Sequence, residues 1–128
     1  MIRSSLIAVA LAVCLLALSA AAEHHEGASG QSQGETDVVE IVSTNVQGKN
    51  VFIPSTIVVE AGKPQALSIF NTTDTPHGFS IDAANVQTVL PPGQEHRVEL
   101  PAMKPGIDKV YCQLHPAHRT ARLLVVGD

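Results

Sequence analysis

Beyond residue 37 the chain alternates between short apolar runs and clusters of turn-forming residues. Apolar positions recur at every second residue in several runs, as in half-buried β-strands, and no long segment has the 3.6-residue period of an amphipathic helix. The pattern predicts about seven to eight strands spaced roughly ten residues apart, the signature of an all-β Greek-key β-sandwich. The predicted strands are residues 38–46, 56–60, 65–71, 77–81, 86–90, 94–100, 109–111 and 120–126.

The N-terminal residues 1–22 have a different pattern. Arg3 precedes an apolar run at 6–18, and small residues follow at 19–22. As a helix this run would be roughly 20 Å long, which is short of the hydrocarbon core of about 30 Å. We therefore predict a signal peptide at 1–22, cleaved after Ala22, with cleavage after Ala20 as the alternative. The protein is then expected to be exported and periplasmic, with no membrane span after cleavage.

Residues 23–37 contain no large apolar side chain, so they are predicted to be a flexible leader before a domain at 38–128. Cleavage after Ala22 would leave a free amine with His25 as the third residue. Such a start offers Cu(II) a square-planar set of nitrogen ligands. The alternative for this leader is a solvated tail, and the cleavage position decides whether the motif exists.

Length and charge restrict the class of protein. The chain has 128 residues, with 8 Lys and Arg against 12 Asp and Glu and a formal net charge of −4. This length suits one modest domain with its own core. The basic residues are scattered singly, so no nucleic-acid partner is expected.

Removal of the signal peptide would leave Cys112 as the chain's remaining cysteine, because Cys14 lies within 1–22. A lone thiol in an oxidising compartment has three explanations: a buried core residue, a disulfide to another chain, or a metal thiolate. The residues around Cys112 favour the metal thiolate.

Cys112, His115 and His118 lie on the predicted loop between the last two strands, where Pro116 restricts the backbone. His77 starts a predicted strand after a polar loop and is expected at an end of the sandwich, where loops cluster. Thiolate and imidazole ligands suit copper and zinc, and two His with one Cys and a weaker fourth ligand is the pattern of electron-transfer copper.

The sequence resembles the cupredoxin family over about residues 38–127. The resemblance rests on Phe52-Ile53-Pro54, residues 57–62, Pro76-His77-Gly78-Phe79, Pro92-Gly93, and Tyr111-Cys112 with His115 and His118. It implies that His77, Cys112 and His115 bind one copper ion per chain. Asn71 and the loop after it are expected to hydrogen-bond near the thiolate, as outer partners of metal ligands do.

The axial ligand departs from the common cupredoxin pattern, because no Met follows Cys112. His118 stands at the position where the binuclear copper domains of nitrous oxide reductase and cytochrome oxidase subunit II, to which the loop has some similarity, carry Met. Those domains need two loop cysteines. We therefore expect a mononuclear site of His77, Cys112, His115 and His118, similar to the one in nitrosocyanin, while a His118 turned to solvent remains the alternative. His96 and Met103 are expected outside the site.

The favoured function is one-electron transport between copper and a redox partner protein. One alternative is periplasmic copper capture and delivery to a copper acceptor, which the six His of the chain support and the lack of a Met-rich stretch weakens. Another is a small copper redox enzyme of the nitrosocyanin type, although four protein ligands would close the coordination position that catalysis needs. A structural zinc site also fits one Cys and three His.

Imidazole is a stronger donor to Cu(II) than a thioether. We therefore expect a reduction potential below that of Met-ligated relatives, and a green or red site.

Overall fold

The structure, a computed structural model, describes residues 37–127. The predicted signal peptide and all but the last residue of the predicted leader lie outside the described residues, so both remain predictions. In the described part of the chain, no helix is long and apolar enough to cross a membrane.

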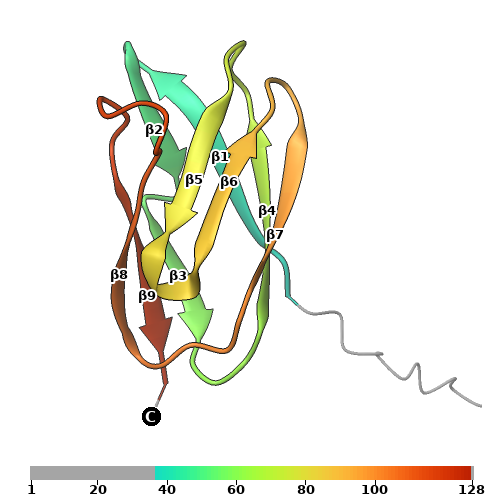
Figure 1. Cartoon of the computed structure of the whole chain (residues 1–128), viewed down its shortest axis with the longest axis vertical. Coiled ribbons are helices and arrows are strands. Elements are labelled where there is room, and N and C mark those ends of the chain that lie inside the picture. Colours follow the sequence, from blue (N-terminus) through green and yellow to red (C-terminus); the bar gives the residue numbers. More distant parts are fainter. Residues whose placement is uncertain (1–36, 128) are drawn as a thin grey trace, which may run out of the picture. The chain divides into compact units, whose positions relative to one another are not determined.

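The described residues form strands joined by short turns, with one turn of 3-10 helix, η1 (Asp82–Ala84) (Figure 1). The strands are β1 (Val39–Val46), β2 (Lys49–Ile53), β3 (Thr56–Glu60), β4 (Gln65–Asn71), β5 (His77–Ile81), β6 (Val86–Leu90), β7 (Glu95–Leu100), β8 (Gly106–Val110) and β9 (Ala121–Val126).

The strands form a sandwich of mixed sheets. One sheet has the order β2-β1-β4-β7, and β1 and β4 are parallel. The second has the order β3-β9-β8, with β3 and β9 parallel. The hairpin β5-β6 joins the second sheet through two backbone hydrogen bonds between Ser80 and Tyr111, of 2.9 and 3.1 Å. The predicted all-β Greek-key sandwich is confirmed.

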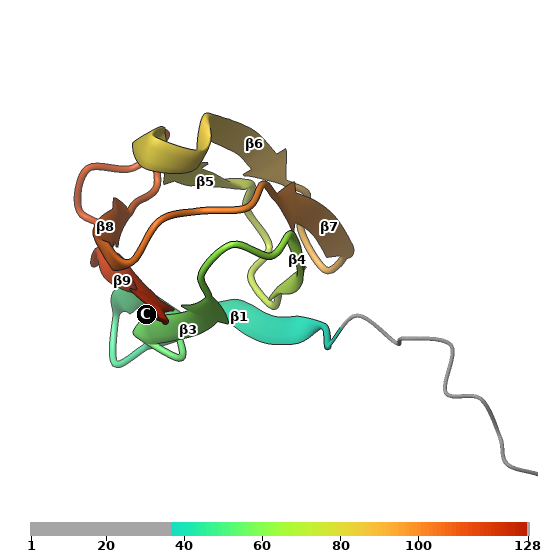
Figure 2. The ribbon, with the colours of Figure 1, turned by 90° about the horizontal axis from the view of Figure 1, so that it is seen from below.

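The strands surround a single apolar core. Viewed along the sandwich, β8 and β9 lie opposite β4 and β7, while β5 and β6 close a third side (Figure 2). Inward positions alternate with exposed ones, as in β3, where Ile57 and Val59 are buried between exposed neighbours. The buried cluster extends to Cys112. Close packing therefore supports the end of the molecule that carries the candidate ligands.

One strand, β2, was not predicted. It forms a hairpin with β1 through Gln47 and Gly48, whose φ angles of 51° and 78° suit a two-residue hairpin turn. Only Phe52 of β2 is buried, so the strand has too little apolar alternation to be recognised. The strand predicted at 109–111 begins earlier, at Gly106. The prediction missed this start because Ile107 is exposed, so the segment lacks the alternation of buried and exposed positions.

Four connections gather at one end of the sandwich: the turns β1–β2 and β6–β7, the loop β4–β5, and the segment 111–120 between β8 and β9 (Figure 1). This is the end at which His77 and Cys112 were expected to meet.

Candidate metal centre

The ligand loop begins where β8 ends. Cys112 is 5% exposed and follows Tyr111, which is paired with Ser80 of β5. The loop closes on itself through a hydrogen bond of 3.0 Å from the His118 N–H to the His115 carbonyl. Its exit is fixed by the Arg119 N–H, which donates to the Asn50 carbonyl at 2.9 Å. The backbone of the loop is therefore fixed at both ends by protein hydrogen bonds.

His77 is placed by the loop between β4 and β5. Asn71 ends β4, is fully buried, and donates from Nδ2 to the carbonyls of Thr75 at 2.8 Å and Leu90 at 3.1 Å. Its Oδ1 accepts from the N–H and the hydroxyl of Thr73. One amide side chain thus holds the loop that leads into His77, which is 1% exposed.

The structure brings His77, Cys112 and His115 together. One donor atom from each residue lies within 4.8 Å of the other two. Cys112 Sγ lies 3.6 Å from His115 Nδ1, and the rings of His77 and His115 have centroids 4.9 Å apart. Segments 35 residues apart in the sequence thus converge on one point. This spacing of one thiol and two imidazoles is compatible with a copper site.

The donor to the thiol is a backbone group. The Gly78 N–H lies 3.1 Å from Cys112 Sγ. Asn71 was expected to act near the thiolate, but its hydrogen bonds go to Thr73, Thr75 and Leu90. The donor is a backbone N–H, which every residue except proline has, so the sequence could not predict this contact.

Gln113 covers Gly78. Its Oε1 accepts from the Ser80 hydroxyl at 2.8 Å, and its Nε2 donates to the Thr88 carbonyl at 2.8 Å. A Cβ on Gly78 would collide with the end of the Gln113 side chain, so any larger residue here would require Gln113 to move. Gln113 is another residue of the site that no sequence pattern indicated.

His118 lies beside the three-residue group and is 4% exposed. Its Nδ1 is 2.9 Å from the Arg119 carbonyl, which accepts only, so Nδ1 carries the proton and Nε2 has a free lone pair. Its ring lies 4.2 Å from the Phe52 ring and 5.2 Å from the His77 ring, centroid to centroid. Coordination by His118 stays a prediction, since the group within 4.8 Å consists of the other three residues.

Two imidazole nitrogens at this end are buried without a hydrogen-bond partner, His77 Nδ1 and His118 Nε2. A buried polar atom normally has a partner, so an unpaired lone pair fits a metal ligand. Burial lowers the pKa of His77, and the nearby His118 and His115 lower it further. Burial also lowers the pKa of His118. Both rings are therefore neutral at pH 7, the form that binds metal.

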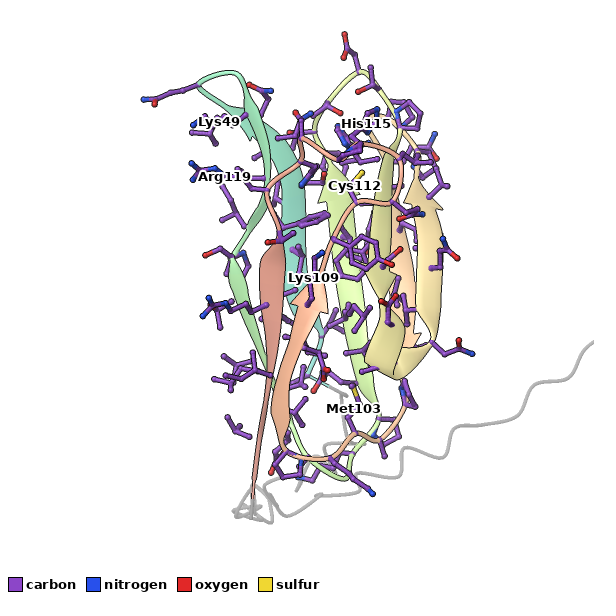
Figure 3. The ribbon with its side chains drawn as sticks, turned by 60° about the vertical axis from the view of Figure 1, so that its left-hand side comes forward. Lys49, Met103, Lys109, Cys112, His115 and Arg119 are labelled. Atoms are coloured by element: carbon purple, nitrogen blue, oxygen red, sulfur yellow. The ribbon has the colours of Figure 1, made fainter. Side chains whose placement is uncertain are left out.

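The other candidate ligands lie elsewhere. Met103 is at the opposite end of the sandwich from Cys112 and His115 (Figure 3). His96, in β7, has its Nε2 2.9 Å from the Thr88 hydroxyl. Among the described His, Cys, Asp and Glu side chains, His96 is not part of the group of donors around Cys112.

The chain as a whole is similar to known copper proteins. The family model of the cupredoxin-like domain matches residues 7–125. The chain belongs to the cupredoxin-like family, whose members bind copper. A search of curated proteins gave no significant match.

Solved structures show the same fold at low sequence identity. A purple cupredoxin from Nitrosopumilus maritimus is 19% identical, with a TM-score of 0.51 over 69% of this chain and 99% of its own. Dithionite-reduced auracyanin from Roseiflexus castenholzii is 18% identical, with a TM-score of 0.57 over 70% of this chain and 97% of its own. An oxidized amicyanin mutant is 13% identical, with a TM-score of 0.53 over 70% and 82%.

Proposed function

We propose that the protein is an exported one-electron carrier with one copper ion, bound by His77, Cys112 and His115 and by His118 as the fourth ligand. The observation that carries this proposal is the convergence of one thiol and two imidazoles within 4.8 Å at the loop end of a cupredoxin-like sandwich. When bound there, copper would supply a one-electron couple.

The residues around the site favour electron transport over exchange of the metal. Asn71 holds the loop before His77, and Gln113 fastens the ligand loop to Ser80 and Thr88, all through protein hydrogen bonds. These contacts join protein groups only, so the fold itself helps to hold the ligand positions. A rigid ligand set changes little when the charge of the metal changes, which suits rapid electron transfer.

The fourth ligand sets the character of the site. The His118 Nδ1–H faces a backbone carbonyl, which is the outer contact that metal-binding histidines usually make. Its unpaired Nε2 is then the donor. An imidazole in place of a thioether favours Cu(II), so we propose a low reduction potential and a green or red colour.

The partner and compartment are part of the proposal. The N-terminal pattern of Arg3, an apolar run and small residues supports export to the periplasm. His115 is the partly exposed imidazole of the group, beside exposed Leu114. Electrons would pass to and from a redox partner protein at this end.

Repeated redox cycling distinguishes a carrier from a copper-delivery protein. The copper-loaded protein is reduced and reoxidised through many turnovers in the presence of a Cu(I) chelator, and bound copper is then counted. A carrier keeps its copper and its spectrum. Transfer of the metal to the chelator after the first reduction would instead support capture and delivery.

A further inference from the structure

Exposed cations are unevenly distributed over the described residues. Lys63 lies 2.6 Å from a Glu60 oxygen and Arg97 lies 2.8 Å from a Glu99 oxygen. Across residues 37–127, the other Lys and Arg side chains have no carboxylate within 4.0 Å and are all exposed. They are Lys49, Lys104, Lys109, Arg119 and Arg122.

Lys49, Lys109, Arg119 and Arg122 form what we call the basic surface. Lys109 of β8 is directly paired with Arg122 of β9, so both side chains leave the same face of the sheet. Lys49 and Arg119 line one shallow hollow with Val46 and Val51. By contrast, Lys104 follows Met103 at the far end of the sandwich (Figure 3).

The basic surface adjoins the metal-binding end. Lys109 lines a hollow that also contains Cys112 and His118. Arg119 directly follows His118, and its backbone N–H is fixed to Asn50 at 2.9 Å. Figure 3 shows Lys49 at the level of the loop end that carries His115, and Arg119 at about the level of Cys112, both along the left-hand edge of the sandwich. A protein bound over His115 would therefore lie within reach of these charges.

We propose that the basic surface docks an acidic patch on the redox partner. This inference rests on the proposed electron transport. The formal net charge of −4 repels an acidic partner at most orientations, so four unpaired cations beside the site would select one orientation. Electrostatic steering of this kind raises association rates by about 10 to 10³-fold. It acts mainly on the association rate and weakens with salt.

The test compares single charge reversals of equal size. Lys49→Glu and Arg122→Glu change the basic surface without touching a proposed ligand, and Lys104→Glu is the matched control at the far end. Each reduced, copper-loaded protein is mixed with a one-electron oxidant, either anionic hexacyanoferrate(III) or cationic tris(phenanthroline)cobalt(III). One electron passes from the protein to the oxidant, and the rate is followed by stopped-flow absorption.

At low ionic strength, Lys49→Glu and Arg122→Glu should each slow the hexacyanoferrate reaction about threefold or more and accelerate the cobalt reaction. Lys104→Glu should change either rate by less than about 1.5-fold. Equal effects of all three substitutions would overturn the proposed surface. Failure of the proposed function would give a different result. Neither oxidant would then react reversibly with the unsubstituted protein or with any of the three variants.

A binding arm tests the kind of partner, with and without copper. Calorimetric titration with poly-L-glutamate should show binding that weakens at least threefold in Lys49→Glu and Arg122→Glu and is retained in Lys104→Glu. Vesicles of phosphatidylglycerol and phosphatidylcholine form the comparison. Binding to the vesicles in preference to poly-L-glutamate, or to neither probe, would overturn the assignment of an acidic protein partner.

Discussion

At the scale of single residues, the orientation of His118 supports its proposed role as the fourth copper ligand. Its Nδ1–H is directed to the Arg119 carbonyl at 2.9 Å, while Nε2 is buried without a partner. The ring is also packed against Phe52. This orientation leaves one lone pair free beside His77, which the proposed coordination by His118 requires.

Replacement of this donor should change the reduction potential. In His118→Met a thioether takes the place of the imidazole, and the weaker donor stabilises Cu(II) less. We expect the potential to rise by about 60 mV or more, which corresponds to a tenfold change in the equilibrium for one electron. Spectroelectrochemical titration measures it. An unchanged potential and spectrum would show that His118 is not a ligand.

Gly78 and Gln113 give a second prediction at this scale. Gly78→Ala places a Cβ in collision with Gln113 Oε1, so Gln113 must move and give up its hydrogen bonds to Ser80 and Thr88. The free energy of unfolding should fall by about 1–3 kcal/mol.

The control is a double-mutant cycle measured by urea unfolding. Gln113→Ala removes the clashing side chain, so the double variant with Gly78→Ala should cost less than the sum of the single costs. Additive costs would mean that the two residues do not share the contact described.

The candidate ligands could be identified from sequence because their chemistry is carried by the side chains themselves. The motif from Cys112 to His118 is compact, and His77 follows an obvious turn. The Gly78 N–H and the cover formed by Gln113 could not be found in the same way. They depend on how β5 meets the ligand loop in space, and neither residue type indicates that contact.

At the scale of elements, the loop between β4 and β5 is controlled by Asn71. This side chain makes hydrogen bonds to Thr73, Thr75 and Leu90 while fully buried. Asn71→Ala should lower the free energy of unfolding by about 2–4 kcal/mol, because several buried backbone and hydroxyl groups lose their partner. It should also speed the release of copper, since His77 follows this loop.

Asn45→Ala is the matched control. Asn45 also bridges a turn, with bonds of 2.9 Å to Asn50 and Gly48, but these bonds are exposed. We expect a cost below about 1 kcal/mol. Both variants are compared by thermal unfolding and by transfer of copper to a chelator. Equal losses of stability in the two variants would contradict the role given to Asn71.

Most strands were predictable because each is a short run that buries apolar side chains and is bounded by turn-forming residues. Thr56–Glu60, Gln65–Asn71, His77–Ile81 and Val86–Leu90 have the predicted bounds. β2 was missed because tertiary packing, rather than alternation, makes it a strand: Phe52 alone reaches the core. The pattern of apolar positions likewise did not predict which strands pair in parallel.

At the scale of the whole molecule, three imidazoles share one end of the sandwich, and this affects stability. Burial lowers the pKa of His77 and His118 below the ordinary value of 6.5. Below pH 6.5 the unfolded chain therefore binds more protons than the folded chain, so stability is full above pH 6.5 and is lost as the pH falls.

We expect the metal-free protein to show a falling midpoint of thermal unfolding between pH 7.5 and pH 5, measured by circular dichroism. His118→Gln removes one of the two groups and should reduce this slope. A midpoint that stays constant over the window, or rises as the pH falls, would contradict the direction given for these pKa values.

We propose a thiolate copper site at the loop end of the molecule. The most direct measurement is a Cu(II) titration of the protein, followed by visible absorption and electron paramagnetic resonance, beside Cys112→Ser. We predict one strongly coloured copper complex per chain, with the colour lost in Cys112→Ser. A colourless protein whose copper binding survives Cys112→Ser would place the metal elsewhere and contradict the account.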